Sequence, residues 1–111
     1  MKPRSKYSKA LDNMASTKEY RDFILEQLSE VPNITCRPMM GEFLLYADGV
    51  LFGGIYDDRL LVKKDDANAE FGMPEAIPYD GAKPMYLVEE VDNKNRLAEI
   101  VNATRAGLGN K

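Results

Sequence analysis

The chain has 111 residues, of which 44% are hydrophobic and 30% are charged, and its formal net charge is −3. This length and composition are typical of one folded domain and exclude a disordered chain or a fibrous repeat. Because the sequence holds one cysteine and no histidine, it also excludes an internal disulfide and a zinc site built from four cysteine or histidine ligands.

The first segment of the chain is basic. Residues 1–13 contain four basic residues and one acidic residue, a net charge of +3. Since the whole chain has a net charge of −3, the rest of the chain carries −6. We interpret residues 1–15 as a disordered leader and residues 16–111 as the folded domain. The alternative is a short arm that touches nucleic acid. The N-terminus has no apolar run for a signal peptide, and no stretch reaches the length of a membrane helix, so we expect a cytoplasmic protein.

A helix is predicted next. Ser16 and Glu19 fit a capping box, and Pro32 marks the stop of the helix. Apolar residues between them recur every three or four positions and form one stripe, which needs a sheet to cover. The stripe consists of Tyr20, Phe23, Ile24, Leu28 and Val31.

The pattern then changes to strands. Residues 35–39, 42–47, 50–56 and 60–63 predict four strands of an antiparallel meander. Asp48 and Gly49 join the second and third strands, because both residues tolerate the positive φ of a type I′ turn.

The remainder of the chain predicts a loop, a strand and a helix. Glycines and prolines among charges make 65–84 a long surface loop, and 85–89 a fifth strand. Asp92 is expected to cap a second helix, with Gly107 near its end. Its apolar side is formed by Leu97, Ile100, Val101, Thr104 and Leu108. The fold class is therefore α+β, an antiparallel sheet of about five strands flanked by an N-terminal and a C-terminal helix.

Apolar residues point to both faces of the predicted sheet. In 43–46 and 60–62 they follow one another instead of alternating with polar residues. Both faces therefore need cover, and the two helices shield only one of them. One interpretation is that the other face meets a second subunit, in a homodimer, or a ligand in a groove. The other is that the helices and the long loop cover everything.

No catalytic, cofactor-binding or metal-binding constellation is recognised. The acidic pairs 57–58 and 65–66 bracket a strand that separates them by about 20 Å, at about 3.3 Å per residue, so one ion cannot reach both. Cys36 beside Arg37 has no histidine to act as its base, and we interpret it as a small core residue. The pair Gly53-Gly54 indicates a bulge or a close backbone approach, which could shape a groove beside Phe52 and Ile55.

The most distinctive stretch is Arg37-Pro38-Met39-Met40-Gly41. Together with Leu45-Tyr46, Asp48-Gly49, Phe52-Gly53 and Leu61-Val62-Lys63, it resembles the N-terminal domain of the TfoX/Sxy family, over most of the chain from about residue 18. Members of this family include bacterial regulators of natural competence, in which a second, helical domain follows; here the chain stops at Lys111. The resemblance implies an α+β fold, a bacterial cytoplasmic setting and no enzymatic activity.

Three classes of function remain open. The first is a non-enzymatic regulatory or protein-interaction module, with Arg37, Met39, Met40, Gly41 and Tyr46 as candidate interface residues. The second is nucleic-acid binding, in which aromatic residues of the sheet would stack on unpaired bases. The stacking residues would be Phe43, Tyr46, Phe52 and Tyr56, with Arg37, Lys63 and Lys64 nearby. The third is an enzyme or a small-ligand binder that uses a pocket on the uncovered face of the sheet.

Overall fold

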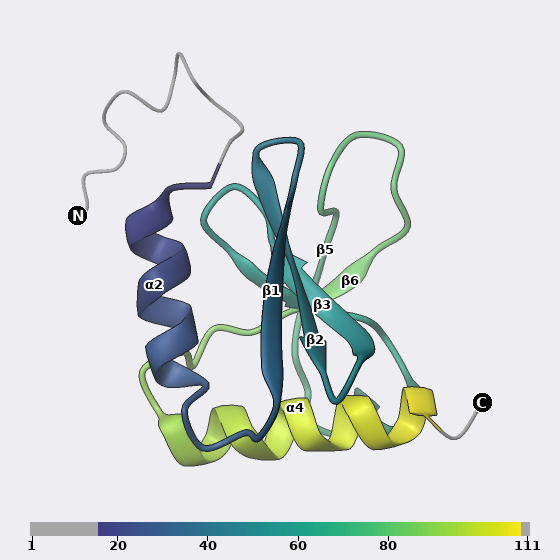
Figure 1. Ribbon diagram of the computed structural model, residues 1–111. Helices are drawn as coiled ribbons and strands as arrows, with labels where there is room; N and C mark the ends of the chain where they lie inside the picture. Colours follow the sequence, from purple (N-terminus) through teal and green to yellow (C-terminus); the bar gives the residue numbers. More distant parts are fainter. Residues whose placement is uncertain (1–15, 110–111) are drawn as a thin grey trace.

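The computed structural model describes residues 16–109, so the expected leader and basic arm at 1–15 lie outside the described residues. A helix comes first, a six-stranded sheet follows, and a long helix comes last (Figure 1). The elements are α2 (Lys18–Gln27), β1 (Ile34–Met39), β2 (Glu42–Ala47), β3 (Val50–Ile55), β4 (Leu60–Val62), α3 (Asp66–Ala69), β5 (Glu75–Ala76), β6 (Met85–Leu87) and α4 (Lys94–Gly109). The predicted α+β class is confirmed.

All neighbouring strands of the sheet are antiparallel, in the order β1-β2-β3-β4-β6-β5. The prediction was wrong in treating all of 65–84 as a surface loop, since α3 and β5 form within it. Both elements are too short to show a periodic pattern. β1 is an edge strand, and it contains Pro38, which an edge tolerates because no neighbour needs the missing N–H group.

Tight turns connect the first four strands: two residues link β1 to β2 and β2 to β3, and 57–58 form the centre of the connection from β3 to β4. Met40 and Gly41 have φ values of 51° and 87°, and Asp48 and Gly49 have φ values of 51° and 79°. Both residues of the third turn, 57–58, have a φ of 55°. Positive φ at both central positions is what a type I′ turn requires, so the predicted hairpin at Asp48 is confirmed.

The two long helices begin at residues other than those predicted. The side chain of Thr17, and not that of Ser16, accepts a hydrogen bond from the Tyr20 amide at 3.0 Å and caps α2. The predicted capping box is therefore wrong, and α2 ends at Gln27, before Pro32. At α4 the predicted cap at Asp92 is also wrong, because Asn93 accepts from the first turn instead.

Both long helices cover the same face of the sheet. Both predicted apolar stripes contribute to the core. The core receives Ile24, Leu28 and Val31 from α2 and the residues just after it, and Leu97, Ile100 and Val101 from α4. Their partners in the sheet and after it are buried as well; these are Phe43, Leu45, Ala47, Phe52, Ile55, Leu60, Val62 and Val88. One core thus lies between the helices and one face, here called the helix face.

A buried polar cluster ties α3 to α4. The Asn68 side chain is fully buried, and its amide nitrogen donates to the Lys63 carbonyl at 2.9 Å and to the Thr104 hydroxyl at 2.8 Å. Its amide oxygen accepts from the Asp65 amide at 3.0 Å. Every polar atom of this side chain that faces the core therefore has a partner.

Within residues 16–109, no helix combines the length and the apolar composition needed to cross a membrane.

A groove on the open face of the sheet

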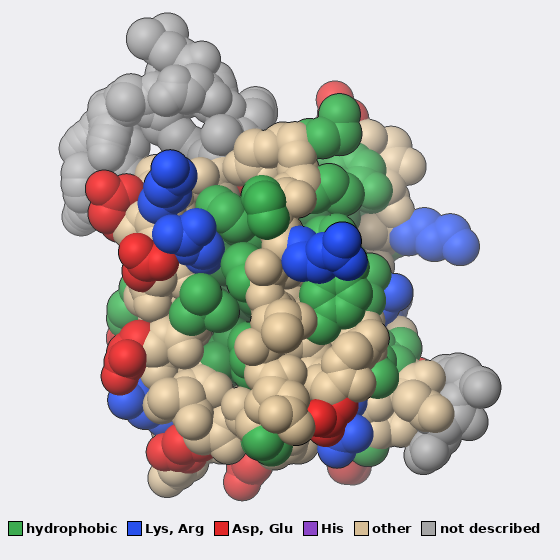
Figure 2. Space-filling view, viewed as in Figure 1, with side chains coloured by type: hydrophobic (Ala, Val, Ile, Leu, Met, Phe, Trp, Pro, Cys, Tyr) green, Lys and Arg blue, Asp and Glu red, His purple; other side chains and the backbone are tan. Residues whose placement is uncertain are grey.

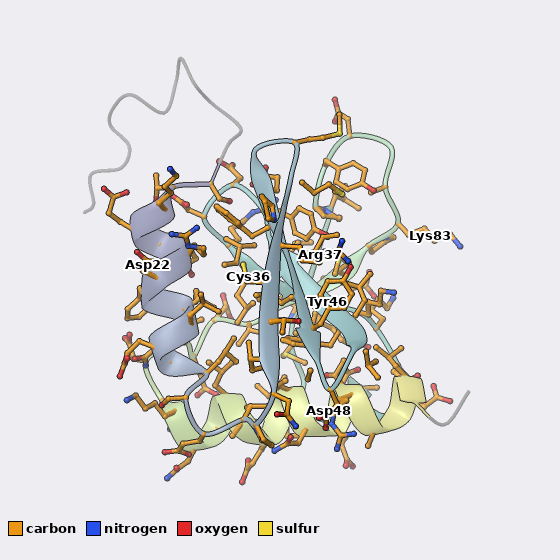
Figure 3. The ribbon with its side chains drawn as sticks, viewed as in Figure 1. Asp22, Cys36, Arg37, Tyr46, Asp48 and Lys83 are labelled. Carbon is orange, nitrogen blue, oxygen red and sulfur yellow. The ribbon has the colours of Figure 1, made fainter. Side chains whose placement is uncertain are left out.

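The other face of the sheet, here called the open face, has no helix over it. In the β1–β2 register Arg37 pairs with Leu44, and Thr35 pairs with Tyr46, so these side chains point away from the helix face. Figure 3 shows the same division, with Cys36 on the side of α2 and both Arg37 and Tyr46 on the other side of β1. The prediction of apolar residues on both faces is confirmed, since Leu44 and Tyr46 lie here half-buried.

Part of the open face is covered by the loop 77–84, between β5 and β6 (Figure 1). Arg59 holds this loop: its guanidinium donates to the Ile77 carbonyl at 3.1 Å and to the Tyr56 carbonyl at 3.1 Å. The ring of Tyr79 lies 6.0 Å from the ring of Tyr56, in a tilted arrangement. The loop is thus attached to the β3–β4 turn and stands over the sheet.

The two glycines of β3 make room below this loop. The register between β2 and β3 shifts at 45–46, which confirms the predicted bulge. A Cβ atom on Gly54 would lie 2.8 Å from the ring of Tyr56, so glycine lets this ring lie close to the strand. The predicted neighbours of a groove here were wrong, because Phe52 and Ile55 are buried in the core on the helix face.

Between the loop and the sheet lies an elongated groove, here called the loop–sheet groove. It consists of two adjoining cavities of about 730 Å³ and 760 Å³, which share Met39, Tyr56, Pro78 and Tyr79 in their walls. Each cavity is within the usual size of a ligand site, about 300–1,000 Å³. The middle of the groove is apolar or aromatic.

The two ends of the groove differ in charge. The first cavity is lined by Lys63, Lys64 and Lys83, and by no acidic residue. The second cavity is lined by three acidic residues and one arginine, which are Glu42, Asp57, Asp80 and Arg59. We call these the lysine end and the carboxylate end.

Large hydrophobic side chains converge on the carboxylate end. Among residues 16–109, four such side chains are exposed: Met40 at 94%, Tyr79 at 57%, Ile77 at 47% and Phe23 at 37%. The first three line the same cavity. Figure 2 shows hydrophobic side chains gathered in the upper part of the view, over the β1–β2 hairpin and the neighbouring loop, with Lys and Arg side chains among them.

A polar cluster fixes the tip of the β1–β2 hairpin beside the groove. The Glu42 carboxylate accepts from the Ser16 hydroxyl at 2.6 Å, from the Ser16 amide at 3.1 Å and from the Asp57 amide at 3.1 Å. Burial raises the pKa of Glu42, and these hydrogen bonds only partly offset the rise. The hairpin tip, the β3–β4 turn and the start of α2 are thereby held together.

The structure places all five predicted interface residues on the β1–β2 hairpin. Met39 and Met40 line the groove, and Gly41 completes the turn at its rim. Arg37 and Tyr46 lie on the same face beside the groove, with the guanidinium carbon 5.9 Å from the ring centroid. Sequence reasoning missed Arg59, Ile77, Tyr79 and Lys83, which come from the loop or hold it.

The other candidates take structural positions. Asp58 accepts from the Thr17 amide at 2.8 Å, and Asp65 caps α3. Cys36 packs against the core, as predicted, and burial raises the pKa of its thiol, so the thiolate is disfavoured. Within the part of the chain that the structure describes, no group of three or more histidine, cysteine or acidic residues could hold a metal ion.

The predicted stacking platform for unpaired bases is wrong. Phe43 and Phe52 are buried in the core on the helix face, and Tyr56 is only 6% exposed, so Tyr46 alone of the four rings offers a free surface.

Fold and groove define a class: a small α+β domain whose antiparallel sheet is covered by helices on one face and carries a groove on the other. The model of the TfoX N-terminal domain family matches residues 26–105. The chain is also 32% identical, over 98 residues, to an "uncharacterized 12.7 kDa protein in trpE 5′ region" of Spirochaeta aurantia, and the match covers 86% of this chain and 85% of that protein. The chain therefore belongs to the TfoX N-terminal domain family.

Proposed function

We propose that this protein is a non-enzymatic regulatory module, which acts in the cytoplasm by binding a partner protein in the loop–sheet groove. One observation carries the proposal: three of the four exposed large hydrophobic side chains among residues 16–109 line one cavity. Scattered apolar side chains are normal on a surface, whereas a cluster beside a groove is typical of a binding site. Family membership supports the regulatory role.

The position of Met40 adds a second argument. It has a φ of 51°, a conformation that costs an ordinary residue about 1–2 kcal/mol and that asparagine, aspartate or glycine adopts more readily. At 94% exposure its side chain gains almost nothing from burial within the chain. A methionine that is unfavourable for the turn and exposed to water is explained if its flexible thioether packs against a partner.

The residues around the groove support a binding role over catalysis. Neither cavity is lined by a serine, threonine or cysteine that could act as a nucleophile, and the chain has no histidine. Burial raises the pKa of Tyr56, so its phenol stays protonated at neutral pH. Lys64 donates to Glu75 at 2.6 Å, and this hydrogen bond raises the pKa of the ammonium group, which stays charged.

The proposal is tested by quantitative affinity capture from an extract of the cells that make the protein. The full chain is compared with Met40→Ser and with Phe23→Gln, which removes an exposed hydrophobic side chain on α2, outside the groove. Circular dichroism first establishes that both variants are folded. We expect a protein whose capture falls with Met40→Ser and persists with Phe23→Gln. Equal capture by all three would contradict the proposal.

Light scattering on the same preparations tests the expected homodimer. A dimer that Met40→Ser dissociates would make a second copy of the chain the partner in the groove. A dimer that Met40→Ser leaves intact would place the subunit contact elsewhere, and a monomer would contradict the homodimer.

A further inference from the structure

We propose that the loop–sheet groove recognises an extended acidic segment of the partner, whose apolar side chains fill the middle and whose carboxylates lie at the lysine end. This inference rests on the function proposed above and adds the chemistry and the orientation of the bound segment.

Charge at the lysine end is the first support. The chain is acidic overall, with a net charge of −3, yet this cavity gathers three lysines and no carboxylate. Of these three lysines, Lys64 alone is paired with a carboxylate among the described residues, that of Glu75. Neither Lys63 nor Lys83 forms an ion pair with any residue from 16 to 109. Both side chains are exposed, and Figure 3 shows Lys83 extending from the loop into solvent, so their ammonium groups are open to charge-assisted hydrogen bonds with an incoming carboxylate.

The carboxylate end sets the orientation. Glu42, Asp57 and Asp80 outnumber the single Arg59 there, so an acidic group placed at this end would on balance be repelled. Only a segment with its acidic residues toward Lys83 satisfies both ends. A nucleic-acid strand carries a phosphate at every nucleotide and would meet the three carboxylates, which makes a peptide the better fit.

Shape is the second support. The two cavities adjoin through shared walls, so the groove is long and open and does not enclose a compact ligand. An extended peptide advances about 3.3 Å per residue and sends alternate side chains to one side. The shared wall includes Met39 and the exposed ring of Tyr79, which suit apolar side chains arriving at that spacing, because methionine adapts to irregular surfaces and tyrosine offers a large apolar ring.

The test is a display selection with a library of random peptides against the full chain. Selected peptides are then synthesised, and their affinities are measured for the full chain and for Lys63→Glu, Lys83→Glu and Lys18→Glu. Lys18 is exposed at the start of α2 and lies outside both cavities. Lys18→Glu is therefore a control that changes the net charge by the same amount as the other two substitutions. An acidic residue in the first turn of a helix is also compatible with its dipole.

The expected result is a set of peptides with acidic residues at one end of an apolar run. Each charge reversal at Lys63 or Lys83 should weaken them about tenfold or more, while Lys18→Glu has little effect. Peptides without acidic residues that bind all variants equally would overturn the inference, and Met40-dependent capture of a partner would then still stand. A single-stranded oligonucleotide that binds the full chain more tightly than every peptide does, and that no longer binds the Lys83→Glu variant, would also overturn it.

Discussion

Replacing Met40 with asparagine should make the protein more stable and its partner binding weaker. The φ of 51° at this position costs a methionine roughly 1–2 kcal/mol, whereas asparagine is favoured in this turn. Because the side chain is 94% exposed, the substitution removes almost no contact within the chain. We expect the free energy of unfolding to rise by about 0.5–1 kcal/mol.

The effect on binding has the opposite sign. Burying a methionine side chain in an interface contributes about 1.5–3 kcal/mol, and each 1.4 kcal/mol is a factor of ten in affinity. Met40→Asn should therefore weaken the complex by about ten- to a hundredfold.

Two assays separate these effects. Urea unfolding followed by circular dichroism gives the change in stability, and titration calorimetry with the captured partner gives the change in affinity. A variant that is less stable than the natural chain would refute the argument from the turn. A variant that is more stable but binds equally well would refute the role of Met40 as a contact.

Three further predictions concern the elements that support the groove. Asn68→Ala removes three hydrogen bonds of a fully buried side chain, worth about 1 kcal/mol each, and should lower the free energy of urea unfolding by about 3 kcal/mol; a loss below about 1 kcal/mol would contradict this. Gly54→Ala places a Cβ atom 2.6 Å from the Phe43 carbonyl oxygen and 2.8 Å from the Tyr56 ring, so it should lower the melting temperature, at a cost of about 1–3 kcal/mol, and an unchanged melting temperature would count against it. Burial raises the pKa of Glu42 above 4.5, so just above that pH the folded state binds more protons than the unfolded state. The ionised Glu42 carboxylate therefore lowers the stability of the fold at neutral pH. Glu42→Gln keeps the acceptor oxygen, and its stability relative to the natural chain should be higher at neutral pH than near pH 4.5; an equal difference at both would rule this out.

Much of the fold follows from local patterns in the sequence. The apolar stripes of both helices predict most of the residues that enter the core, because side chains three or four positions apart share one side of a helix. Phe23 is the exception, since it belongs to the predicted stripe but is 37% exposed. The turn at Asp48 is equally local, since its backbone conformation depends on the two residues themselves. Helix caps were less predictable: Ser16 and Thr17 are both suitable, and the choice depends on Glu42, which is distant in the sequence.

The groove was only partly predictable, because it depends on contacts between distant segments. The hairpin at 37–41 was recognised as distinctive, and the structure places it beside the groove. Arg59 and Tyr79 gave no signal of their own, since one resembles an ordinary turn residue and the other a residue of a polar loop. Their roles become clear only from the folded structure, in which Arg59 donates to the Ile77 carbonyl and the loop covers part of the open face.

The most direct test of the central claim is site-specific photo-crosslinking in living cells. A benzophenone side chain replaces Met40 in one variant and Phe23 in another, the two being exposed hydrophobic residues inside and outside the groove. The account predicts a discrete crosslinked protein from position 40 and none from position 23. The same crosslinked species from both positions, or one from position 23 alone, would contradict the groove as the binding site.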